Sequence, residues 1–102
     1  MPREILAAME IAFWLEKHWQ GEFDWDEGNE NKPLKRAHSC EDIENAFVDF
    51  VFVGEIQPYV DEVWGNVEKR FVIISKLNEK SFRITFTIRG EKIRYISHGR
   101  IR

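Results

Sequence analysis

Cationic side chains are concentrated on short alternating segments in the last third of the chain. The stretch FTIRGEKIRYIS (86–97) and the residues after it contain Arg89, Lys92, Arg94, Arg100 and Arg102. Guanidinium groups bind phosphates through fixed charge and paired hydrogen bonds. These residue types therefore favour binding of a phosphate or of another anion.

The charge of the chain is divided along its length, although the 102 residues sum to a net charge of only −3. Residues 1–68 hold 5 Lys and Arg against 16 Asp and Glu, whereas residues 69–102 hold 10 against 2. A basic half of this kind indicates a polyanion or an acidic partner. The alternative is that the two halves neutralise each other within the fold.

The elements that position these cations follow from hydrophobic periodicity and turn residues. An amphipathic helix is expected over Pro2–Trp19, packed on the protein's own core or on a second copy, and a helical turn over 34–38. Ser39, with Asp42 three residues on, predicts a capped helix over 40–50. Residues 57–66, with Pro58 and Gly65, read as a loop. Strands are expected at 22–26, 50–56, 69–76, 81–89 and 92–97. This order predicts one α+β domain: an antiparallel sheet of about four to five strands with helices packed on one face.

The period of two along a strand assigns the cations to one face of this sheet. In 82–89 the apolar residues alternate with Arg83, Thr85, Thr87 and Arg89. If 92–97 pairs through the Gly90-Glu91 turn, Lys92 and Arg94 lie on or near the same open face, and Arg70 joins them from the preceding strand. Such a face fits phosphate binding; the alternative is a polar face that only meets solvent.

Metal and disulfide chemistry find little support. Cys40 is the single cysteine, so it forms no internal disulfide and has no partner for a zinc site. No His, Cys and Asp set has metal-ligand spacing, and no cofactor is expected. Without an apolar run of about 18 residues or a secretory leader, we expect a cytoplasmic protein outside the membrane.

Four stretches, in this order, resemble the BrnT family of bacterial type II toxins. They are FDWDEGN (23–29) with Lys32, EDIENAFVD (41–49), EKRFVIIS (68–75) and FTIRGEKIRYIS (86–97). The resemblance covers roughly residues 22–100, within a predicted domain of residues 22–102, and leaves 1–21 as an added N-terminal amphipathic helix.

The resemblance implies a RelE-like fold and a toxin that cleaves RNA without a metal. It also implies a small antitoxin partner of the ribbon-helix-helix type, with operator DNA contacted only through the antitoxin. Whether the protein forms a homo-oligomer is left open. The alternatives are a catalytically inactive module of the same fold that binds a partner or RNA, and a small structural domain.

Cleavage of RNA without metal requires cations for the phosphate, a base for the 2′-hydroxyl and a proton for the leaving oxygen. Catalytic candidates are Arg89 and Arg94, which match the family's strongest motif, followed by Arg70, Arg100 and Glu91. RNA-binding candidates are Lys35, Arg36, Arg83, Lys92 and His98. For the arginines the alternative is surface ion pairing with the acidic half. Trp25 is expected in the core, and Asp26 is expected to cap the next helical turn.

Overall fold

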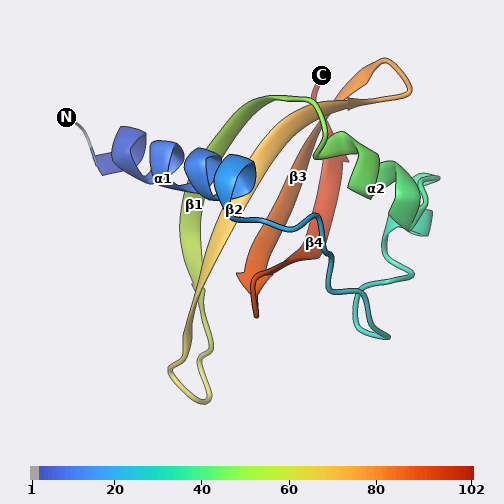
Figure 1. The fold of residues 1–102 in the computed structure, drawn as a ribbon. Helices are drawn as coiled ribbons and strands as arrows, with labels where there is room; N and C mark the ends of the chain where they lie inside the picture. The colour runs from blue at the N-terminus through green and yellow to red at the C-terminus, as the bar shows by residue number, and fades with distance from the viewer. Residues whose placement is uncertain (1–2) are drawn as a thin grey trace.

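The structure, a computed structural model, describes residues 3–102, with side chains described for 9–56 and 58–102. The elements in chain order are α1 (Arg3–Lys17), the 3-10 turn η1 (Pro33–Arg36), α2 (Cys40–Ala46), β1 (Phe50–Val60), β2 (Val67–Leu77), β3 (Lys80–Arg89) and β4 (Lys92–Arg100). The predicted α+β class is confirmed (Figure 1). The predicted helix start at Pro2 lies outside the described residues.

The sheet is an antiparallel meander in the order β1-β2-β3-β4, so each strand pairs with its neighbour in sequence. The two tight turns, Asn78-Glu79 and Gly90-Glu91, both have positive φ at their two central residues. This backbone matches the right-handed twist of the strands that it joins. The short links predicted between the last three strands therefore form hairpins as expected.

A predicted strand and a predicted loop differ from the structure. The strand expected at 22–26 is wrong: this segment makes a single parallel bridge, Phe23 to Ile93. Conversely, β1 runs past Ile56 and through Pro58, which was predicted to lie in a loop. Proline is tolerated there because β1 is an edge strand whose pairing with β2 is interrupted between Ile56 and Tyr59.

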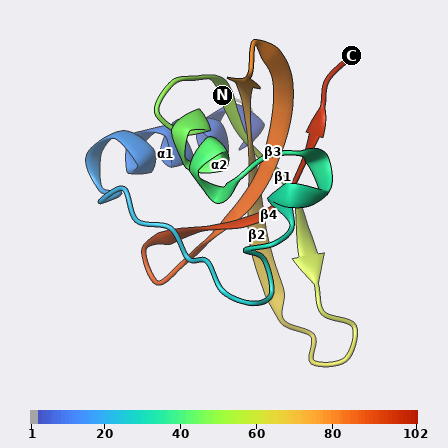
Figure 2. The ribbon, with the colours of Figure 1, turned by 90° about the vertical axis from the view of Figure 1, so that its right-hand side faces the viewer.

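Both α-helices cover one face of the sheet (Figure 2). The core between them is formed by apolar residues of every layer, including Ile43, Ile73, Ile84, Phe86 and Ile93. On β3 the predicted alternation is confirmed as far as Phe86, because Phe82, Ile84 and Phe86 are buried while Arg83 is exposed. Arg89 is exposed as expected, but Thr87 is buried, with its hydroxyl donating to the Lys69 carbonyl at 2.6 Å.

The N-terminal helix packs on the protein's own core, as expected. Ile11 and Leu15 of α1 are buried in the same apolar cluster as the sheet residues, and Trp14 and Trp19 pack against its margin. The Trp19 ring meets Phe23 at 5.2 Å between centroids. Trp25, as expected, also packs on the core, and its Nε1 donates to Glu44 at 2.7 Å.

Helix α2 begins at a complete capping box. The Asp42 N–H donates to the Ser39 hydroxyl at 3.1 Å, and the Ser39 N–H donates to the Asp42 carboxylate at 2.9 Å. These bonds satisfy backbone donors that a helix start leaves without partners. The predicted cap is confirmed, although α2 ends at Ala46 and is shorter than expected. Among the described helices, none is long and apolar enough to span a membrane.

Candidate functional site

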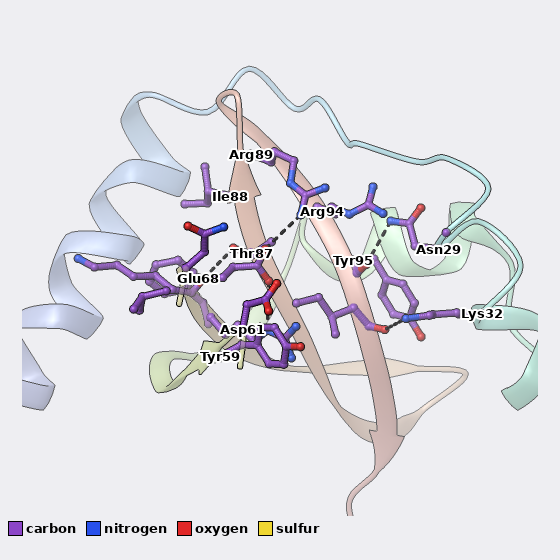
Figure 3. Close-up of a pocket in the computed structure, with 17 residues that line it drawn as sticks. Asn29, Lys32, Tyr59, Asp61, Glu68, Thr87, Ile88, Arg89, Arg94 and Tyr95 are labelled. Carbon is purple, nitrogen blue, oxygen red and sulfur yellow. Dashed lines mark hydrogen bonds and ion pairs between the residues drawn. The ribbon is translucent and has the colours of Figure 1, made fainter. Parts of the chain in front are cut away.

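A hollow of about 890 Å³ lies over the sheet face that the helices leave uncovered (Figure 3). We call it the open-face hollow. Its floor is formed by β2, β3 and β4, and its rim by the 28–32 loop and the β1–β2 hairpin. Three arginines predicted from the sequence, Arg70, Arg89 and Arg94, line it together.

Arg94 is bound by the acidic segment that crosses beside β4. Its two Nη atoms donate to the two carboxylate oxygens of Asp26 at 2.9 and 3.0 Å, and Nη1 lies 3.4 Å from the Asp24 carboxylate. This pairing lowers the pKa of Asp26 and raises that of Arg94. The cap expected from Asp26 is wrong for η1, whose N-cap is Lys32 without a side-chain bond. The Asp26 carboxylate instead accepts from the Gly28 N–H at 2.8 Å and holds a candidate catalytic arginine in place.

Arg70 and Arg89 share one carboxylate. Glu68 accepts from Arg70 Nε at 3.2 Å and from Arg89 Nη2 at 3.1 Å. The Arg70 guanidinium also stacks over the Tyr59 ring, 4.6 Å from its centroid. Since each arginine of the open-face hollow has a carboxylate partner, much of the positive charge predicted for this face is compensated within the fold.

The rim loop is fixed by a buried asparagine. Asn29 Nδ2 donates to the backbone oxygens of Asp24 at 3.0 Å and of Tyr95 at 3.1 Å, while its Oδ1 accepts from the Asp26 N–H at 2.8 Å. Gly28 lies where an added Cβ would come within 3.1 Å of Arg94 Nη2. Sequence reasoning missed Asn29 and Glu68; Asn29 lies inside the FDWDEGN stretch, which is the signal that could have found it.

A second basic region lies at the outer edge of β4. Two adjoining hollows of about 480 and 420 Å³ share Arg36, Ser97 and His98 along their walls. We call them together the edge groove. Its cations are Lys32, Lys35, Arg36, Arg83 and Arg100. The structure therefore places most of the predicted basic residues in two groups, one in the open-face hollow and one in the edge groove.

Behind the edge groove, three buried side chains form a hydrogen-bonded chain. His98 Nδ1 lies 2.7 Å from the Tyr95 hydroxyl, and His98 Nε2 lies 3.0 Å from His38 Nδ1. Burial raises the pKa of Tyr95 to about 12. Burial first, then the proximity of His38 and Arg36, lowers the pKa of His98 to about 4. Tyr95 and His98 are therefore both neutral at physiological pH.

An RNA-contacting histidine would present its ring to the surface, whereas His98 does not. It is 4% exposed, and both ring nitrogens have partners. The cause is a register shift in β4: Tyr95 pairs with Phe86, but Ser97 pairs with Thr85, so Ile96 is an extra residue. Beyond this bulge the alternation reverses, and His98 pairs with Ile84 on the core face.

Two further candidates lie outside the open-face hollow. Glu91 is exposed in the β3–β4 turn and does not line either basic region. The Lys92 ammonium lies 3.6 Å from the Glu22 carboxylate, at the same end of the hairpin. The structure thus brings neither residue to the arginine cluster.

The neutral His98 predicts a pH-dependent stability. The unfolded histidine has its ordinary pKa of 6.5, whereas the folded one has a pKa of about 4. Below pH 6.5 the unfolded chain binds a proton that the folded chain excludes, so we expect the free energy of unfolding to fall as the pH falls from 6.5 to about 4. The contribution is at most about 1.4 kcal/mol per pH unit. Urea unfolding across this window measures it.

His98→Gln is expected to flatten that decline, and the exposed His18→Gln is the matched control that keeps it. An equal pH dependence in the parent and in His98→Gln would contradict the assignment.

The described residues offer no gathering of three or more His, Cys, Asp or Glu side chains suited to a metal ion. Cys40 donates its thiol to the Glu30 carbonyl at 3.3 Å, and burial raises its pKa, so it remains a protonated thiol. The chemistry of the arrangement is that of guanidinium groups with one carboxylate between two of them. These guanidinium groups can bind and stabilise an anion that displaces the carboxylates now paired with them.

Comparisons with protein-family models, with curated proteins and with solved structures find no match to this chain.

Proposed function

We propose that the protein is an endoribonuclease toxin of a type II toxin–antitoxin system, similar to BrnT, which acts in the cytoplasm and cleaves RNA without a metal. The observation that supports it is the convergence of Arg70, Arg89 and Arg94 on one hollow of a size that holds a small ligand. Two of these residues also lie in the stretch that most resembles the family.

In this proposal the arginines stabilise the negative charge that develops on the phosphate during attack by the 2′-hydroxyl. The phosphate takes the place that Glu68 now holds between Arg70 and Arg89. The displaced Glu68 carboxylate stays beside the reacting group and accepts the 2′-hydroxyl proton. As the 2′-oxygen bonds to phosphorus, the bond from phosphorus to the 5′-oxygen breaks, and the leaving 5′-oxygen takes a proton from water. Glu68 is therefore a better candidate for the base than Glu91, which lies in the distant turn.

A protein antitoxin is the proposed partner, and the outer strand β1 supports it. As an edge strand, β1 has one side without a strand neighbour in the described sheet. Val51 and Phe52 on β1, and Val63 and Trp64 in the loop after it, are exposed, Trp64 to 78%. Exposed apolar side chains beside an open strand edge are typical of protein-binding surfaces. A ribbon-helix-helix antitoxin would link the toxin to operator DNA.

A second function is favoured by a different observation. Each arginine of the open-face hollow already has a carboxylate partner. A catalytically inactive module that binds a protein or RNA would retain these ion pairs. In that case the arginines hold the fold and do not act on phosphate.

Induced expression in a bacterial host, with and without the neighbouring gene, tests the toxin. We expect growth arrest with fragmented RNA, both relieved by coexpression of the antitoxin. Normal growth with intact RNA, together with RNA binding by the purified protein, would instead establish the inactive binding module.

A further inference from the structure

The edge groove differs from the open-face hollow in the balance of its charges. In the part of the chain that the structure describes, Lys35, Arg36, Arg83 and Arg100 take part in no ion pair. Among the described side chains, no Asp or Glu lines either section of the groove. Several cations that share one groove repel one another, so an anionic ligand would stabilise this arrangement more than it would the compensated hollow.

The walls of the edge groove also supply neutral polar groups and space. Thr85 of β3 and Ser97 of β4 face each other across the strand pair and line the groove between its cations. Apart from Gly99 and its two chain neighbours, no heavy atom of the described residues lies within 4 Å of the position that a Cβ on Gly99 would occupy, so the wall is open there. Hydroxyl groups beside guanidinium groups are frequent partners of phosphate oxygens.

The edge groove continues into the open-face hollow. Lys32 and Ile96 line both regions, and the Lys32 ammonium donates to the Ile96 carbonyl at 3.4 Å. From Arg94 in the hollow to Gly99 in the groove, the extended strand spans about 15 Å. A flexible polyanion with regularly spaced charges can follow this distance along β4, whereas a single phosphate cannot reach both regions.

We propose that the edge groove holds backbone phosphates of the same single-stranded RNA whose reactive phosphate occupies the open-face hollow, so that the RNA lies along β4. The inference rests on the proposed function and names the path of its substrate. Arg36, Arg83 and Arg100 contact phosphates away from the reaction, and Lys32 connects the two regions. Cations that track a backbone in this way bind single strands with little dependence on sequence.

The test is the salt dependence of binding for Arg36→Gln/Arg83→Gln/Arg100→Gln. The probe is a fluorescent 2′-O-methyl oligoribonucleotide, which cannot be cleaved. For single strands the slope of log affinity against log salt changes by about 0.7 per phosphate contact, so loss of three contacts is expected to flatten the slope by roughly 2. At low salt we expect binding to weaken about tenfold or more.

A matched control is Lys17→Gln/Lys76→Gln/Lys80→Gln, which removes the same charge from exposed positions outside the groove. It is expected to keep nearly the full slope. A groove variant with the same slope as this control would overturn the proposal, and would leave the groove to an acidic protein instead of RNA.

The two proposals can fail separately. If the slope depends on the groove but ordinary RNA stays intact, the RNA path stands and the proposed cleavage fails. If ordinary RNA is cleaved but the salt-dependence slope is the same in the groove variant and the control, the proposed cleavage is supported and the proposed RNA path is refuted.

Discussion

Arg89→Ala/Arg94→Ala is expected to lower RNA cleavage by at least about 100-fold. Loss of one preorganised donor to a developing oxyanion typically costs a factor of that size or more. Arg89 is 55% exposed, so its own removal should leave the fold intact. Arg94 is 14% exposed and holds the Asp24–Asp26 segment, so its loss should also lower the melting temperature. Cleavage of labelled RNA and thermal unfolding are measured on each single variant and on the double variant.

Two companions separate catalysis from loss of structure. Arg94→Lys keeps a cation beside Asp26 and should recover most of the stability but little of the cleavage, because lysine cannot donate two parallel bonds to one phosphate. Glu68→Gln frees Arg70 and Arg89, so it should bind 2′-O-methyl RNA more tightly and yet cleave ordinary RNA more slowly. A double alanine variant that keeps full cleavage, or a Glu68→Gln variant that binds no better, would refute the role of the hollow.

Deletion of residues 1–21 is expected to abolish stable folding. The deletion removes the buried Ile11 and Leu15 and the partly buried Trp14 and Trp19 from the core. Each large apolar side chain contributes about 1.5–3 kcal/mol when buried. Their sum approaches the whole net stability of a domain, about 5–15 kcal/mol. Soluble yield and circular dichroism of the truncated chain measure the loss.

Point variants keep this prediction quantitative if the truncated chain is insoluble. Leu15→Ala should lower the free energy of unfolding by about 2–5 kcal/mol. Met9 lies on the same helix but is 56% exposed, so Met9→Ala should change the free energy of unfolding by less than about 0.5 kcal/mol. A truncated protein with unchanged stability would show that α1 contributes nothing to the core.

The features that the sequence predicted well are those set by neighbouring residues. The alternation on β3, the capping box at Ser39 and the turn at Gly90-Glu91 each depend on a few consecutive side chains. The gathering of Arg70, Arg89 and Arg94 on one face also follows from strand periodicity once the hairpins are assumed.

The features that escaped prediction depend on contacts between distant segments. Asp26 binds Arg94 across a separation of 68 residues, and no local pattern reports such a pair. The bulge at Ile96 leaves the composition of β4 unchanged and yet moves His98 from the open face to the core. The segment 22–26 alternates as a strand does, but its backbone makes a single bridge, to Ile93, and forms no ladder. Whether carboxylates neutralise the arginines of the basic face was therefore a question that only the tertiary structure could decide.

The meander order has a consequence for synthesis on the ribosome. Each hairpin joins neighbours in sequence and can form as soon as its second strand emerges. The open-face hollow cannot, because its 28–32 rim loop is held against β4 by the bond from Asn29 to Tyr95, and because Arg94, which Asp26 binds, lies on β4 itself. A nascent chain therefore waits for β4 to leave the exit tunnel before the arginine cluster is assembled. If the protein cleaves RNA, it cannot act on its own messenger RNA or on the ribosome that makes it until β4 is in place.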